Sequence, residues 1–162
     1  MDAIEFWNVI DKVIESEVPE EDIKKHLNRL NPEEIVSYQE HFDSFFENAY
    51  QWDLWGAAYL IEGGCSDDGF MDFRYGLISK GKDIYEASMI NPDNLADYDF
   101  KDEISNELFG YSALEVYEEK TDTEIPRKKF EQTDDPMGEE WDFDDEDENK
   151  KRLPRLWGKY GF

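Results

Sequence analysis

The chain has 162 residues, of which 42 are aspartate or glutamate and 17 are lysine or arginine, so its formal net charge is −25. Aromatic residues make up 15% of the chain, which argues against intrinsic disorder, because disordered chains are poor in aromatics. A field of this sign repels nucleic acids and anionic lipids and attracts basic proteins, so we expect a basic protein partner and neither a nucleic acid nor a membrane.

Three features of the sequence bear on the compartment. The only cysteine is Cys65, which excludes an internal disulfide and is typical of a reducing environment. Residues 1–5 lack the basic region of a signal peptide. No apolar run approaches the roughly 20 residues of a membrane-spanning helix. We therefore expect a cytoplasmic protein, and the sequence leaves its oligomeric state open.

The first part of the chain has repeated helix-start signals. Asp2 is followed three residues later by Glu5, in the pattern of a capping box. Pro19 suits the first turn of a second helix, and Asn31 followed by Pro32 gives the same signal for a third. Apolar residues recur at helical spacing after each signal. The expected helices span about residues 2–16, 19–30 and 32–49.

The next stretch is the most apolar and aromatic part of the chain. Trp52, Trp55 and Tyr59 lie on one side of a helix over 52–62, and small or aliphatic residues lie on the other. A helix that is apolar all round is buried, so we expect this helix to be central, with Trp55 and Tyr59 buried. Gly63 is its expected end.

Helical signals continue beyond the glycines. Ser66 or Asp67 can cap another helix, and Gly81 can end it. Asn91 and Pro92 begin a turn or a short helix, and the stretch 95–111 has no clear period. No run alternates as a strand would, so the sequence predicts a compact all-α domain. The expected helices span about 67–80, 82–90 and 112–120.

The composition changes near residue 133. Residues 134–149 contain ten acids and no base, and the chain then ends in a basic, aromatic stretch. We predict a helical domain over 1–133 and, in 134–162, an acidic, partly irregular segment with a docked C-terminus belonging to the same domain. Leu153, Leu156 and Trp157 are expected to pack against the helical body, since they share one helical face.

One long motif resembles a known family. Residues 50–59, YQWDLWGAAY, residues 63–70, GGCSDDGF, and the pair Phe73-Arg74 are similar to an uncharacterised bacterial family, domain of unknown function 4240 (DUF4240). Phe6-Trp7 and Leu153-Pro154 also fit. The resemblance covers most of the chain. Because no activity is assigned to the family, the resemblance implies no catalytic residues.

Two charged residues are placed where apolar neighbours are expected. Asp53 lies on the apolar helix, and Arg74 lies in the apolar stripe of the helix that follows. Because a buried charge must be paired, we predict an ion pair between Arg74 and Asp53 or Asp67. The functional alternative is a polar pocket that binds a small anion or a partner's side chain.

Polar residues cluster at the turn between these helices. Cys65 has no base nearby in sequence, so a reactive thiol is not expected. Asp67, Asp68 and Asp72 could bind Mg²⁺ or Ca²⁺ through oxygen atoms, but their spacing differs from the calcium-loop pattern, and helix capping is the commoner role. We therefore expect no metal and no cofactor.

The two histidines lie beside apolar stripes. His26 and His41 are too far apart in sequence to define a zinc site, and a half-buried structural role is the simpler interpretation. His41 is flanked at helical spacing by aromatic residues, which keeps it among the binding candidates. The candidate binding residues are Asp53, Asp67, Asp68, Asp72, Arg74 and His41.

Two classes of function remain. The first is a non-enzymatic, acidic interaction protein: an antitoxin-like, immunity-like or nucleic-acid-mimic partner of a basic protein. The net charge and the lack of a legible catalytic set favour it. The alternative is a hydrolase or a small-ligand-binding module that uses the turn from Gly63 to Arg74 with a divalent metal. No catalytic residue can be assigned.

Overall fold

The computed structural model describes residues 1–100, 104–127 and 135–161. Throughout these residues the regular elements are helices, and the one β-type pairing is an isolated bridge between Gln51 and Met137. The predicted compact all-α fold is confirmed. The elements are α1 (Ala3–Asp11), α2 (Pro19–Leu27), α3 (Pro32–Asn48), α4 (Trp52–Glu62), α5 (Asp67–Ser79), α6 (Lys82–Ile90), the 3₁₀ helix η1 (Pro92–Asp97), α7 (Glu107–Gly110), α8 (Ser112–Thr121), α9 (Glu146–Arg152) and α10 (Pro154–Tyr160).

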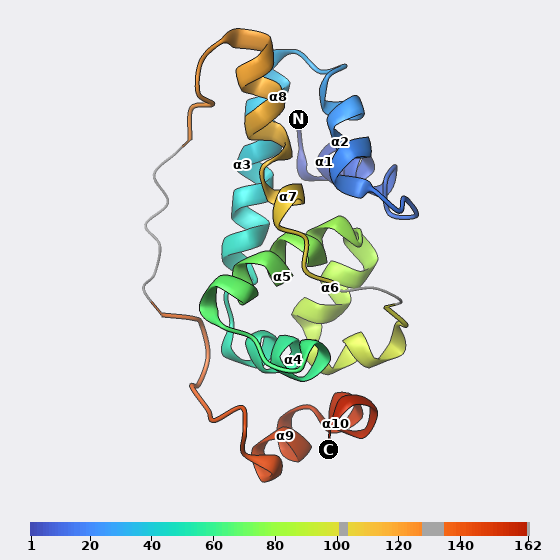
Figure 1. Cartoon of the computed structure of the whole chain (residues 1–162), viewed down its shortest axis with the longest axis vertical. Coiled ribbons are helices and arrows are strands. Elements are labelled where there is room, and N and C mark those ends of the chain that lie inside the picture. The colour runs from blue at the N-terminus through green and yellow to red at the C-terminus, as the bar shows by residue number, and fades with distance from the viewer. Residues whose placement is uncertain (101–103, 128–134, 162) are drawn as a thin grey trace.

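The helices are distributed along one long axis (Figure 1). Helices α1, α2, α3 and α8 form the upper end, with α8 packed on α2 and α3. Helices α5 and α6 lie in the middle, α4 lies beneath them, and α9 and α10 form the lower end. None of the helices in the described ranges is both long and apolar enough to cross a lipid bilayer.

Side-chain caps set the starts of the helices. The Asp2 carboxylate accepts from the Glu5 N–H at 2.8 Å, and the Asn31 amide oxygen accepts from the Glu34 N–H at 2.9 Å. Ser66, rather than Asp67, caps α5, since its hydroxyl accepts from the Gly69 N–H at 3.1 Å. The first helix is shorter than predicted: after Asp11 the chain continues in turns closed by i→i−3 bonds, which tighten a helix end.

The stretch of helix buried on all sides is the C-terminal half of α5 and not α4, which corrects the prediction of a central helix over 52–62. All seven residues from Phe73 to Ser79 are buried. At Gly76, an added Cβ would lie 1.6 Å from the Ile104 carbonyl oxygen, so the backbone of residues 104–106 lies directly against the helix. Because several of these buried residues are small or polar, the apolar periodicity of the sequence did not predict the burial of α5.

Helix α4 is buried on one side only. Leu54, Ala57 and Ala58 are fully buried, whereas Trp55 and Tyr59 are partly exposed. The prediction that Trp55 and Tyr59 are buried is therefore wrong. The Phe143 ring of the C-terminal segment packs beside both, with its centroid 5.7 Å from that of Trp55 and 5.5 Å from that of Tyr59.

The C-terminal segment packs on the helical body. Leu153 and Leu156 are fully buried, as predicted, but Trp157 is partly exposed. The Asp93 carboxylate of η1 accepts from the N–H groups of Arg155 and Leu156 at 3.1 and 2.9 Å, where the N-terminal end of α10 favours a negative charge. The predicted boundary at residue 133 falls outside the described residues, so the division at that point stays a prediction.

Candidate functional site

The Arg74 side chain lies among aromatic rings at the core of the candidate site. Arg74 is only 4% exposed. The guanidinium carbon lies 3.9 Å from the ring centroid of Phe46, 4.5 Å from that of Tyr50 and 4.9 Å from that of Phe70. The guanidinium also donates to the carbonyl oxygens of Phe70 and Phe46, at 3.3 and 3.1 Å. We call Phe46, Tyr50 and Phe70 the aromatic cage of Arg74, since ring faces attract a cation.

The predicted ion pair of Arg74 is wrong. No carboxylate in the described part of the chain lies within ion-pair distance of the guanidinium. Asp67 instead accepts a hydrogen bond from the Tyr50 hydroxyl at 3.1 Å. The Tyr50 ring, which belongs to the aromatic cage, therefore links Asp67 to Arg74. Burial lowers the pKa of Arg74 to about 10, which still leaves it charged at neutral pH. Ring faces and carbonyls take the place of a carboxylate here.

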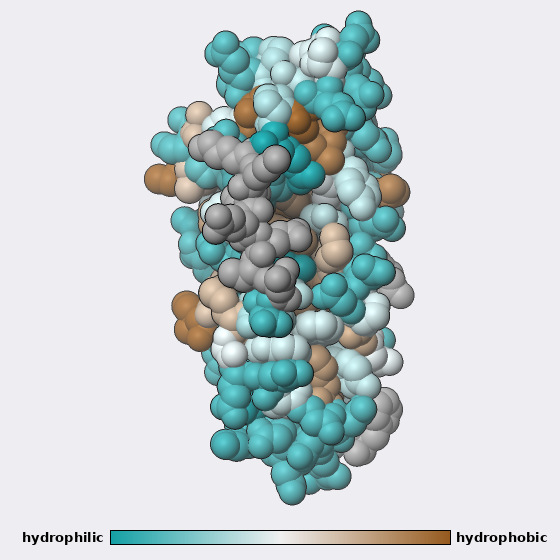
Figure 2. All heavy atoms as spheres, turned by 90° about the vertical axis from the view of Figure 1, so that its left-hand side faces the viewer, coloured by the Kyte–Doolittle hydropathy of each residue, from teal (hydrophilic) through white to brown (hydrophobic). Residues whose placement is uncertain are grey.

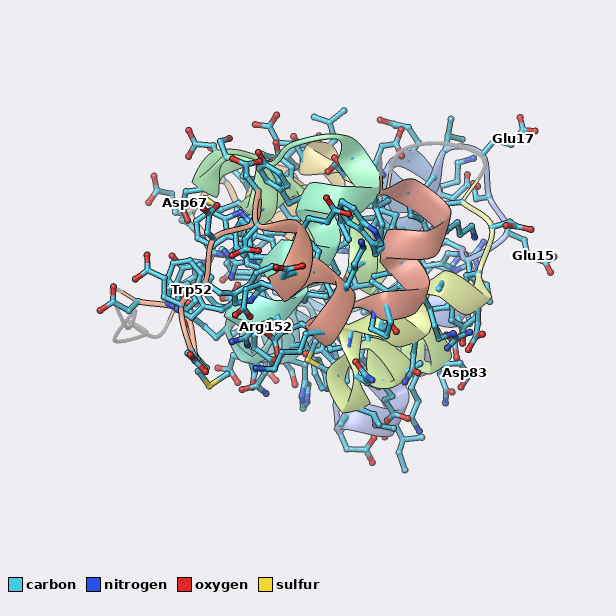
Figure 3. All side chains as sticks on the ribbon, turned by 90° about the horizontal axis from the view of Figure 1, so that it is seen from below. Glu15, Glu17, Trp52, Asp67, Asp83 and Arg152 are labelled. Carbon is cyan, nitrogen blue, oxygen red and sulfur yellow. The ribbon has the colours of Figure 1, made fainter. Side chains whose placement is uncertain are left out.

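Asp53 belongs to a different contact set, which joins α4 to the C-terminal segment. Its Oδ1 accepts from the Trp141 indole N–H at 3.0 Å and lies 3.3 Å from Arg152 Nη1. Arg152 also pairs with Glu148 at 2.8 Å and with Glu139 at 3.3 Å, and its guanidinium lies 5.3 Å from the Trp141 ring centroid. We call Asp53, Trp141 and Arg152 the α4 clamp; Figure 3 views this end of the molecule from below and labels Arg152.

Two acids that were not among the sequence candidates, Glu62 and Glu107, act on Asp72 of the turn through their charge. Burial raises the pKa of Asp72, and the charges of Glu107, Asp68 and Glu62 raise it further. Glu62 accepts from the Ser105 hydroxyl at 2.8 Å. Among the residues described, no group of three His, Cys, Asp or Glu side chains is arranged to hold a metal ion. Glu107 lies in the stretch 95–111, where the sequence had no readable period, so nothing there signalled its position.

Cys65 lies in the corner that turns α4 into α5. Gly63 and Gly64, with φ of +69° and +114°, make this corner in a backbone region that glycine favours. Burial, followed by the charges of Glu62 and Asp72, raises the pKa of the Cys65 thiol to about 12. The thiol is therefore protonated at neutral pH, and a thiol is a poor nucleophile. The Trp55 indole N–H donates to the Cys65 carbonyl at 2.9 Å, which fixes the corner.

His41 lies apart from the turn, against the N-terminus. Its Nε2 is 2.9 Å from the Met1 carbonyl oxygen, and its ring centroid is 5.9 Å from that of Phe6. His26 is also half-buried, and burial is the main cause of its lowered pKa. The structure therefore brings Asp67, Asp68, Asp72 and Arg74 to one corner, with Asp53 in the α4 clamp and His41 at the N-terminus.

An ion pair between the buried Asp43 of α3 and the exposed Arg127 was also not predicted from the sequence. Asp43 is 7% exposed and receives two bonds from Arg127, at 2.9 and 3.3 Å, and one from Gln39 at 2.8 Å. Arg127 follows α8 by several residues, and no spacing in the sequence connects it to Asp43. The pair ties the chain after α8 to α3.

Comparisons with known proteins place the chain in one family. No curated protein and no solved structure matches it. A family model does match residues 1–119, which include α1 to α7 and most of α8. This match confirms the resemblance seen in the motif of residues 50–74, and the C-terminal segment lies beyond it. The chain belongs to the family described as protein of unknown function, DUF4240.

Proposed function

We propose that this protein is a non-enzymatic binding protein whose partner is a basic protein. The observation that supports the proposal is that many of its basic side chains form ion pairs with acids of the same chain. Arg127 pairs with Asp43, Arg152 with three acids, and Arg155 with Asp97. Several lysines are also taken up by the chain's own acids, at Lys24, Lys25, Lys150 and Lys159.

The surface left to a partner is therefore strongly acidic. Acids exceed bases by 25 over the whole chain. Figure 2 shows one face that is mostly hydrophilic, and in Figure 3 the labelled Glu15, Glu17 and Asp83 point outward from the molecule. Such a field speeds the encounter with a basic protein and disfavours acidic competitors. An antitoxin-like, an immunity-like and a nucleic-acid-mimic role all use this property, because each occupies a basic site on its partner.

A capture experiment tests the proposal. The full chain is immobilised and exposed to extract of its native cell at low salt, next to an unrelated bait of similar net charge. We expect retention of a basic protein that the control bait does not hold. The purified partner should bind directly, and more weakly toward 1 M salt, where the screening length falls to about 3 Å. Retention of the same proteins by both baits would contradict the proposal.

One observation favours the alternative, a hydrolase or ligand-binding module with a divalent ion. Burial and the charges of Glu107, Asp68 and Glu62 raise the pKa of Asp72, so a bound cation would relieve repulsion between these carboxylates, although the described residues include no group of three side chains arranged to hold a metal ion. Calorimetric titration with Mg²⁺ and with Ca²⁺ tests this directly. Saturable binding at one ion per chain, abolished by Asp72→Asn, would favour the alternative over the binding-protein proposal.

A further inference from the structure

An open apolar groove lies between the C-terminal end of α3, helix α6 and the chain around Met137. Its volume is about 570 Å³. Two of its large apolar residues are exposed to solvent: Ile90 at 82% and Met137 at 49%. Among the residues that the structure describes, Glu86 is the one charged residue of its lining. The apolar lining consists of Phe45, Tyr85, Met89, Ile90 and Met137.

Hydrogen bonds hold the walls of this groove in place. The Met137 N–H donates to the Tyr50 carbonyl at 2.8 Å, and the Trp52 N–H donates to the Met137 carbonyl at 3.0 Å. The Tyr85 hydroxyl donates to the Phe45 carbonyl at 2.6 Å, which joins α6 to α3. The groove therefore exists before any partner arrives, and its methionine side chains can adapt to the surface they meet.

Acidic side chains lie along the α6 edge of the groove. Asp83 and Glu86 lie on the exposed side of α6, three residues apart, in line with Ile90. Figure 3 shows Asp83 pointing outward. On the other side, Glu139 follows Met137 by two residues and is 79% exposed, and its carboxylate lies 3.3 Å from Arg152 Nη2. The one base close by on α6 is Lys82, at its first residue. An apolar floor with an acidic edge along α6 fits a ligand that is apolar on one side and carries basic residues next to that side.

We propose that the groove binds an amphipathic, basic helix of the partner protein. The nine residues of α6 make a wall about 13 Å long, which matches roughly two and a half turns of a helix. Apolar anchors of that helix at positions i, i+3 or i+4 and i+7 would enter the groove, as in other helix-in-groove complexes. A second copy of this chain is a poor occupant, since two molecules of charge −25 repel each other.

Methyl NMR can locate the binding, because the chain has only four methionines. Met89 and Met137 line the groove, whereas Met1 and Met71 do not, so they serve as internal controls. The probes are three peptides of about 18 residues, long enough to form helix: an amphipathic leucine/lysine peptide, its leucine/glutamate counterpart, and a scrambled leucine/lysine peptide. We expect the first to shift the Met89 and Met137 signals and the glutamate peptide to shift none.

A pair of matched variants then tests the contribution of the groove. Ile90→Lys and Ile4→Lys make the same change at two isoleucines that are 82% and 66% exposed, and only Ile90 lines the groove. Neither change disturbs a buried site. We expect Ile90→Lys to weaken binding of the amphipathic basic peptide about tenfold or more, and Ile4→Lys to change it by about twofold at most.

The inference rests on the proposed function, but the two can fail separately. Equal binding of the amphipathic and scrambled basic peptides, without shifts at Met89 and Met137, would overturn the inference that the groove binds a basic helix. The proposal that the protein binds a basic partner would still stand. Failure of the peptides together with failure of the capture experiment would overturn both. Concentration-dependent shifts of Met89 and Met137 without peptide would identify a second copy as the occupant and overturn the inference.

Discussion

The contact between Gly56 of α4 and the Trp141 ring makes a sharp prediction for the variant Gly56→Ala. An added Cβ would lie 2.3 Å from Trp141 Cζ2 and 2.8 Å from Cη2. Ordinary carbon contacts are about 3.5–4.0 Å, so the indole must move by more than about 1 Å. That movement also strains the 3.0 Å bond from the indole N–H to Asp53.

The expected magnitude is a balance of opposing effects. Alanine in place of glycine inside a helix stabilises the helix by about 1 kcal/mol. Overpacking costs about 1–3 kcal/mol, and a weakened hydrogen bond to the charged Asp53 adds to that cost. We expect Gly56→Ala to lower the free energy of unfolding by about 1–3 kcal/mol, because the steric cost exceeds the gain in helix propensity.

Urea denaturation of four proteins measures this balance: the natural chain, Gly56→Ala, Trp141→Ala and the double variant. Trp141→Ala alone should cost about 3–5 kcal/mol, since it empties a site that is 8% exposed. In that background, Gly56→Ala should be neutral or should stabilise by up to about 1 kcal/mol. Stabilisation by the same amount in both backgrounds would refute the packing of Trp141 on Gly56.

Three further outcomes are expected. Leu156→Ala should lower the free energy of unfolding in urea by about 2–5 kcal/mol, well beyond the partly exposed Trp157→Ala, and equal losses would contradict the docking of α10. Because burial raises the pKa of Cys65 to about 12, iodoacetamide at pH 8 should alkylate the folded chain far more slowly than the unfolded one; similar rates would count against a buried thiol. The pKa of Asp72 is raised, so its ionisation destabilises the folded state, and the stability it contributes below its unfolded pKa is lost as pH rises through its folded pKa. Asp72→Asn should therefore stabilise at pH 7 and lose that advantage below about pH 4, whereas the same advantage at both pH values would rule out ionisation as its cause.

Much of the fold could be predicted because its helices have local signals. The capping residues Asp2 and Asn31 and the glycines at 63 and 81 lie where helices begin or end. Helix α6 spans residues 82–90, as predicted. Burial of Leu153 and Leu156 also followed from the pattern, since apolar residues on one face of a basic stretch need a surface to cover them.

The candidate site was predicted less well, because it depends on contacts between distant parts of the chain. Arg74 is buried, but its partners are three rings and two carbonyls, which residue type and spacing do not reveal. Asp53 is paired with Arg152, 99 residues further along the chain. Trp55 and Tyr59 are less buried than their helix pattern indicated, since their outer side depends on cover from Phe143. Periodicity describes a helix face, and it does not specify which segment covers that face.

The α4 clamp has a consequence for folding during synthesis. Trp141 is made 88 residues after Asp53, the acid it contacts. At about 5–20 residues per second, the ribosome needs about 4–18 s to cover that distance. During this interval the indoles of α4 and the bare backbone at Gly56 have no cover from the C-terminal segment. We therefore expect the nascent chain to expose an aromatic surface that chaperones bind until Trp141 has left the ribosome.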